Sequence, residues 1–198
     1  MLHNMMASPA PRTRRPDGIS VHPNLPVLPV SIAFFDLSLT STGVALYKED
    51  HITTELCTPR TRGVARLKEL DDWIRWFLIR ECPQFVGVEG YSFASKGSRA
   101  HSIGEWGGVA KLAIKSRPRT TSFIASPKTI KKFMGNGNAT KTQMGLWLLE
   151  KYGITIMQED EADAACGSIL IGAHLYAGSF ASLTQSQHDA IAGIEPMT

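Results

Sequence analysis

Two apolar runs, 30–35 and 43–47, stand on either side of a short polar turn. Asp36 directly follows the first run, and mostly small polar residues lead from it to Gly43. Apolar runs of this length around a turn predict two neighbouring strands. A carboxylate within such a pair loses much of its hydration, which is costly unless something compensates for the charge. We therefore expect a partner for Asp36, which could be a metal ion, a phosphate-bound magnesium or a structural group.

The apolar periodicity of the remaining chain predicts an α/β domain. A third strand over 52–57 completes a β-meander, and apolar spacings of three and four predict an amphipathic helix over 61–81. Further strands are expected at 85–88 and 120–125, and further helices at 102–115, from Pro127 to a break at Gly135, at 140–152 and at 159–176. This order predicts a mixed five-stranded sheet with helices on both faces.

We expect one domain over 30–178, preceded by a disordered leader over 1–29 and followed by a flexible tail over 179–198. No apolar run reaches the length of a membrane span, and the leader lacks the apolar core of a secretory signal. Three scattered cysteines without metal-ligand spacing favour reduced thiols in a cytosolic setting.

Charge is distributed unevenly along the chain, although the net formal charge is only +3. The segment 96–141 has ten basic residues and one acid, whereas 142–198 has one base and seven acids. A basic segment favours an anionic polymer as partner, and the alternative is that the opposite charges neutralise each other in the fold. The candidate phosphate contacts are Arg99, Lys111, Lys115, Arg117, Arg119, Lys128, Lys131 and Lys132.

Three further carboxylates resemble Asp36 in their setting. Glu89 ends an apolar strand and precedes Gly90, while Asp160 and Asp163 share one face at the start of a predicted helix. Stabilisation of the helix dipole would account for Asp160, but less well for Asp163, which an apolar run follows. Four converging carboxylates would raise one another's pKa unless a counter-ion were present. Two magnesium or manganese ions ~3.5–4 Å apart would supply it and could cleave a phosphodiester, so we predict a metal site at these residues.

The motifs resemble, in order, those of the RuvC-type Holliday junction resolvases of the RNase H-like superfamily. They are Phe35-Asp36 with Thr42-Gly43, Val86 to Glu89, Pro127, Ala139-x-Lys141-x-Gln143 and Asp160-x-x-Asp163-Ala164. The resemblance covers about 32–176. The family often has Asp-Pro-Gly where this chain has Asp36-Leu37-Ser38, which is typical of a divergent branch, such as one encoded by a phage.

This resemblance implies a metal-dependent crossover junction endodeoxyribonuclease. Such an enzyme is a homodimer that resolves four-way junctions and related branched DNA, such as forks and flaps, by paired nicks that leave 5′-phosphate and 3′-hydroxyl ends. It implies two Mg²⁺ or Mn²⁺ ions per site, held by Asp36, Glu89, Asp160 and Asp163, with Lys141 as a contact to the scissile backbone. It also implies the cytoplasm of a bacterial cell, or of the host if the protein is phage-encoded.

Two further features gain a meaning from the resemblance. An aromatic residue is common three positions after the family's Glu, where this chain has Ser92 between Tyr91 and Phe93. Either aromatic could stack on an unpaired base or belong to the core.

The expected helix 102–115 carries Gly104, Gly107 and Gly108, each costing ~1 kcal/mol relative to Ala. The resemblance suggests a dimer interface there, and packing on the sheet is the alternative.

Other interpretations of the same motifs remain. One is a branched-DNA-binding protein with weak catalysis, against which the four carboxylates argue. Another is an actin-like nucleotide-binding protein, since the turn after Asp36 resembles the first phosphate loop of that class; those proteins are about twice as long and carry a second such loop. The segment 135–142 imitates a Walker A loop, but Thr140 replaces its second glycine and the segment follows an expected helix, not a strand.

Overall fold

A six-stranded mixed sheet organises the chain in the computed structural model, which describes residues 24–90, 98–156 and 158–198. The strands lie in the order β3-β2-β1-β4-β5-β6. Their bounds are β1 (Leu28–Leu37), β2 (Thr42–Glu49), β3 (His51–Cys57), β4 (Phe85–Glu89), β5 (Thr121–Ala125) and β6 (Glu195–Pro196). The first three form the expected antiparallel meander, and β4 and β5 run parallel to β1. The predicted mixed α/β class is confirmed, with one strand more than expected.

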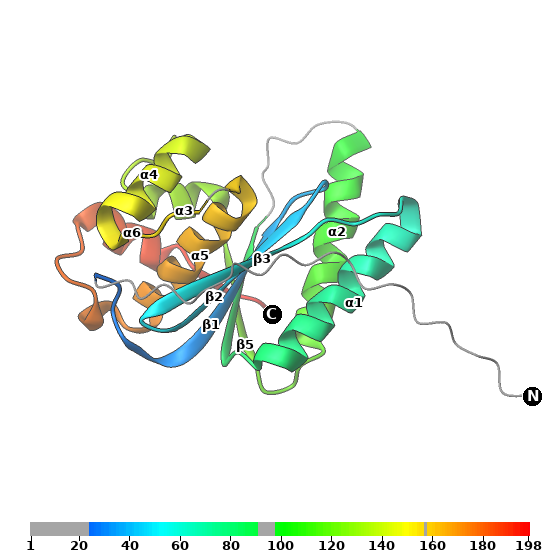
Figure 1. Cartoon of the computed structure of the whole chain (residues 1–198), viewed down its shortest axis with the longest axis horizontal. Helices are drawn as coiled ribbons and strands as arrows, with labels where there is room; N and C mark the ends of the chain where they lie inside the picture. Colours follow the sequence, from blue (N-terminus) through cyan, green and yellow to red (C-terminus); the bar gives the residue numbers. More distant parts are fainter. Residues whose placement is uncertain (1–23, 91–97, 157) are drawn as a thin grey trace, which may run out of the picture.

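Helices cover both faces of the sheet (Figure 1). On one face lie α1 (Gly63–Glu81) and α2 (Ser98–Lys115). The other face carries α5 (Glu159–Leu175), with α3 (Pro127–Phe133), α4 (Lys141–Tyr152) and α6 (Gln185–Ala192) around it and the short turn η1 (Ala177–Ser179) after it. None of the helices within the described ranges is both long and apolar enough to cross a membrane.

The central strand β1 supplies both apolar cores because its side chains alternate between the two faces. Phe34 lies in the core under α5, whereas Phe35 lies in the opposite core, edge-on to Trp73 of α1 with ring centroids 6.1 Å apart. Gly167 allows α5 to approach closely, since a Cβ there would lie 2.3 Å from the Phe34 ring. This tight packing fixes the first turn of α5 over the end of β1, where Asp36 lies.

The end of the chain differs from the expected flexible tail over 179–198. Helix α6 begins with a capping box at Thr184, and Ala190, Ile194 and Met197 are buried. β6 then pairs antiparallel with β5. The apolar residues here are too sparse to signal a core-facing segment in the sequence. Of the expected leader, residues 1–23 lie outside the described part of the chain, and Leu25 and Leu28 are buried.

Candidate active site

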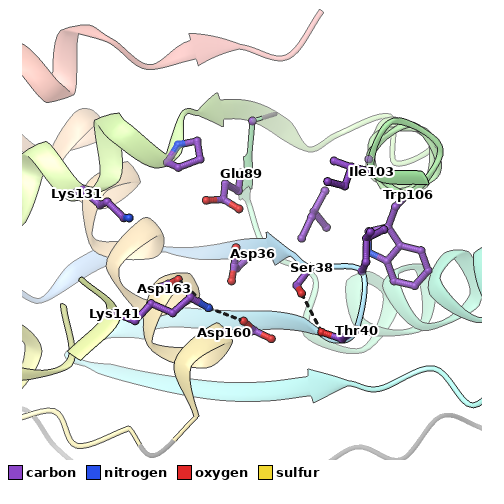
Figure 2. A pocket seen from close by; sticks show the side chains of 15 residues that line it. Asp36, Ser38, Thr40, Glu89, Ile103, Trp106, Lys131, Lys141, Asp160 and Asp163 are labelled. Atoms are coloured by element: carbon purple, nitrogen blue, oxygen red, sulfur yellow. Dashed lines mark hydrogen bonds and ion pairs between the residues drawn. The ribbon is translucent and has the colours of Figure 1, made fainter. Parts of the chain in front are cut away.

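Four carboxylates line one cavity at an edge of the sheet. β1 and β4 are parallel neighbours in which Phe35 pairs with Val88, so Asp36 and Glu89 follow side by side. The first turn of α5 brings Asp160 and Asp163 over the same edge. All four line a cavity of about 550 Å³ together with Lys131 and Lys141. Figure 2 shows the carboxylates arranged around a shared space, with Lys141 beside those of α5.

Asp36 and Glu89 form the buried half of this site. Asp36 is only 5% exposed. Burial, followed by the charge of Glu89 and a hydrogen bond to it, raises the pKa of Asp36 well above its ordinary value. Burial also raises the pKa of Glu89, although the hydrogen bond with Asp36 opposes this. The hydrogen bond between the two groups raises the pKa of Asp36 and lowers that of Glu89, so of the two Asp36 is the one that favours its protonated form.

Lys141 neutralises the outer half of the site. Its Nζ lies 3.1 Å from Asp160 Oδ1, 3.5 Å from Glu159 Oε2 and 3.7 Å from Asp163 Oδ2. Partial burial would lower the pKa of Lys141, but the hydrogen bond to Asp160 and the neighbouring acids raise it overall. Lys141 begins α4 directly after Thr140, whose capping box fixes the first turn of that helix. Lys141 therefore carries a positive charge whose position is fixed by these ion pairs and by the start of α4.

The donor set fits a divalent cation. Asp163 Oδ1 is buried and has no hydrogen-bond partner among the described residues. Burial is the main cause that raises the pKa of Asp163, and Lys141 only partly offsets it. Carboxylate oxygens are the ligands that Mg²⁺ and Mn²⁺ prefer. A cation here would give the orphaned oxygen a partner and would stabilise the ionised form of all four acids.

The tightest ligand grouping lies elsewhere, at the turn between β2 and β3. Within the described ranges, only Glu49, Asp50 and His51 bring three possible ligand atoms within 4.8 Å of one another. These are consecutive, partly exposed residues, and exposed acidic groups commonly occur without an ion. No three of the four predicted carboxylates are that close, so a cation held by three of them at once would require their side chains to move closer together.

Of the predicted DNA contacts on α3, one lines the cavity and two lie outside it. Lys131 lines the cavity, and its charge partly offsets the rise that burial causes in the pKa of Glu89 and of Asp163. Lys128 is exposed on the same helix, α3, whereas Lys132 pairs with Asp189 of α6 at 3.0 Å.

The other predicted contacts lie outside the cavity or cannot be placed. Tyr91 and Phe93 lie outside the described residues, and of Arg99 only the position in α2 is described. Arg117 and Arg119 precede β5 at the end of the strands opposite Glu89.

Sequence reasoning missed three residues that hold the turn after Asp36. Ser41 Oγ donates a hydrogen bond to Asp160 Oδ2. Trp106 Nε1 donates to Thr42 Oγ1 at 3.1 Å, and Arg66 Nη1 donates to the carbonyl of Leu39 at 3.2 Å. The available signal was the cluster of hydroxyl residues between Asp36 and Gly43, and no comparable signal marks Arg66 or Trp106.

Two glycines of α2, Gly104 and Gly108, are not required by close packing within the described structure. A Cβ on Gly104 or Gly108 would meet nothing within 4 Å. Packing on the sheet therefore does not explain either glycine, and the dimer interface stays a prediction.

Several solved structures share this fold. Thermus thermophilus RuvC is 18% identical with a TM-score of 0.60, and the match covers 84% of this chain and 99% of that chain. T. thermophilus RuvC in complex with a Holliday junction substrate is 17% identical with a TM-score of 0.62, at the same coverages. The yeast mitochondrial Holliday junction resolvase Ydc2 is 11% identical with a TM-score of 0.50, covering 84% of this chain and 82% of that chain. No protein-family model and no curated protein matches the chain. The chain therefore has the fold of the RuvC-type resolvases, as its motifs predict.

Proposed function

We propose that this protein is a divalent-metal-dependent endonuclease that resolves four-way DNA junctions. The observation that carries the proposal is the gathering of Asp36, Glu89, Asp160 and Asp163 with two lysines in one cavity. The solved structures of similar fold are resolvases, and one of them holds a Holliday junction, which supports branched DNA as the substrate class. Forks and flaps are the related substrates to test.

The four carboxylates would hold two Mg²⁺ or Mn²⁺ ions. When bound, these ions would activate the water nucleophile and stabilise the charge that develops on the phosphate. A carboxyl group must be ionised to act as a metal ligand, and the raised pKa of Asp36 opposes its ionisation until a cation binds.

Lys131 and Lys141 would bind the scissile phosphate from the side of α3 and α4. The raised pKa of Lys141 keeps its ammonium charged at neutral pH, so it acts as a phosphate contact and not as a base. Lys128, on the exposed side of α3, would extend this contact along the strand. Arg99 stays a proposed phosphate contact, and Tyr91 or Phe93 a proposed stacking contact for an unpaired base.

A homodimer would carry two such sites and nick two opposed strands. Gly104, Gly108 and Leu112 are spaced by four residues on α2, and Leu112 is 66% exposed. Small residues at this spacing allow a second helix to approach closely, which supports α2 as part of the interface. The nicks would leave 5′-phosphate and 3′-hydroxyl ends.

Cleavage of a labelled four-way junction, beside a linear duplex of equal length, tests the proposal. With Mg²⁺ and then Mn²⁺, paired nicks on the junction alone are expected. Glu89→Gln should abolish cleavage and retain junction binding in a gel-shift assay, whereas Glu150→Gln, at an exposed position on α4, should cleave normally.

Three results would contradict the proposal. Equal cutting of the linear duplex would contradict structure selectivity, and full activity of Glu89→Gln would contradict the assigned site. Tight junction binding without cleavage in either metal would instead establish a binding protein. A P-loop nucleotide site is disfavoured because the segment 135–142 follows α3 and not a strand.

A further inference from the structure

We infer that the turn between β1 and β2 positions Asp160, through the hydroxyl of Ser41 and the close backbone approach of Gly43. The inference rests on the proposed function, in which Asp160 is a metal ligand. It assigns Ser41 as a positioning residue that touches neither DNA nor metal and acts through Asp160.

Both oxygens of Asp160 are held, each by a different element. Ser41 Oγ donates to Oδ2, and Lys141 Nζ lies 3.1 Å from Oδ1. The Lys141 side chain is 41% exposed, whereas that of Asp160 is 17% exposed. Lys141 is also the proposed phosphate contact, so once DNA is bound its ammonium group must donate hydrogen bonds both to the phosphate and to Asp160. Ser41 is then the contact that continues to orient the carboxylate.

Gly43 sets the distance between β2 and the first turn of α5. A Cβ on this residue would lie 2.1 Å from the carbonyl oxygen of Asp160 and 3.0 Å from the backbone nitrogen of Glu161. Both contacts are with backbone, which cannot rotate away as a side chain can. The backbone of Asp160 therefore packs directly against β2, the strand that follows the turn.

The turn itself is anchored from the opposite face of the sheet. Arg66 of α1 donates to the Leu39 carbonyl, and its guanidinium lies 5.0 Å from the centroid of the Trp106 ring. Trp106 of α2 donates to Thr42 Oγ1 at 3.1 Å, and both residues are fully buried. The position of Ser41 is therefore set by α1 and α2, independently of the helix whose carboxylate it holds.

Groups that orient a metal ligand typically change metal affinity about 10–100-fold when they are removed. Calorimetric titration with Mn²⁺ alone is the first measurement. Ser41→Ala should bind Mn²⁺ at least about 10-fold more weakly than the parent, whereas Ser41→Thr, which keeps the hydroxyl, should stay close to it.

Junction cleavage is the second measurement. Ser41→Ala should lower kcat at limiting Mn²⁺ and recover at high Mn²⁺. Its KM for the junction should be unchanged, because both phosphate-binding lysines remain.

The matched control is Ser116→Ala. Ser116 accepts a hydrogen bond from Arg75 and so joins α1 to the end of α2, away from the site. This variant should lose a hydroxyl contact between elements without losing Mn²⁺ affinity. Gly43→Ala should weaken Mn²⁺ binding more than Ser41→Ala does, and Gly145→Ala, where a Cβ meets nothing within 4 Å, is its control.

The outcomes separate this inference from the proposed function. Unchanged Mn²⁺ affinity in Ser41→Ala, or equal weakening in the Ala and Thr variants, would overturn the positioning role even if Glu89→Gln abolishes cleavage. Weaker Mn²⁺ binding in Ser41→Ala alone, with no DNA cleavage by the parent, would support the positioning role while the nuclease assignment fails. A parent that binds no Mn²⁺ would overturn both.

Discussion

Asp36→Asn is expected to stabilise the metal-free protein at neutral pH. Burial and the neighbouring Glu89 raise the pKa of Asp36 well above the ordinary value of 3.8. The unfolded chain therefore releases this proton at a lower pH than the folded chain does. Between the two pKa values, each pH unit lowers the parent's free energy of unfolding by about 1.4 kcal/mol. Asn has a similar shape and carries no charge, so the variant avoids this loss.

The advantage of the variant should depend on pH. Parent and variant should differ little near pH 4, and the difference should grow by about 1.4 kcal/mol per pH unit until the folded Asp36 ionises. For a chain of this length, that corresponds to a difference in Tm of about 3–6 °C per unit. Thermal unfolding in EDTA from pH 4 to 8 measures it, and Asp72→Asn, at an exposed position on α1, is the control.

Added Mg²⁺ should reduce the stability advantage of Asp36→Asn over the parent, because Mg²⁺ binds the ionised carboxylates of the folded parent. At a hundredfold excess over Kd, binding would add about 2.7 kcal/mol to the parent's stability, and the variant, lacking one ligand, should gain less. A variant that is less stable than the parent at pH 7.5 in EDTA would refute the reasoning. So would an advantage that does not change with pH.

Three further predictions concern stability and thiol chemistry. Arg80→Met should lower the free energy of unfolding by about 2–3 kcal/mol in urea titrations, because it removes the guanidinium partner of the largely buried Glu55; no change would contradict this. Thr140→Ala should cost about 1 kcal/mol by loss of the α4 cap, whereas Thr140→Ser should cost less. One thiol of three, that of the exposed Cys82, should react with a thiol reagent in the folded protein, since the other two are buried and burial raises the pKa of Cys57 to about 12; three reactive thiols would contradict the packing.

Elements with a continuous apolar run could be predicted from the sequence. The runs in β1, β4 and α5 indicate that these elements exist, and the acids that border the runs are therefore placed at the ends of the elements. That Asp36 and Glu89 could meet followed from their positions at strand ends only if the two strands are neighbours, and the structure supplies that pairing. Such inferences need only the period of a segment and the direction of its neighbour.

The remaining contacts depend on partners that are distant in the chain. Ser41 and Asp160 are 119 residues apart, and nothing in either segment indicates the hydrogen bond that joins them. Lys132 and Lys131 look equivalent in the sequence, yet one faces Asp189 and the other the cavity. For α6, the spacing Thr184-x-x-Gln187 was a usable signal, since it is a capping-box pattern.

The short strand β6 bears on the solubility of the protein. An uncovered strand presents a row of free backbone groups on which other chains can assemble. Here Met197 donates to the Ser122 carbonyl at 2.8 Å, which occupies part of that row on β5. Pro196 has no N–H to offer a further strand. A chain that lost residues 195–198 would keep the four carboxylates in place but would expose the backbone groups along the edge of β5. We expect such a chain to aggregate through that edge and not to lose its active-site residues.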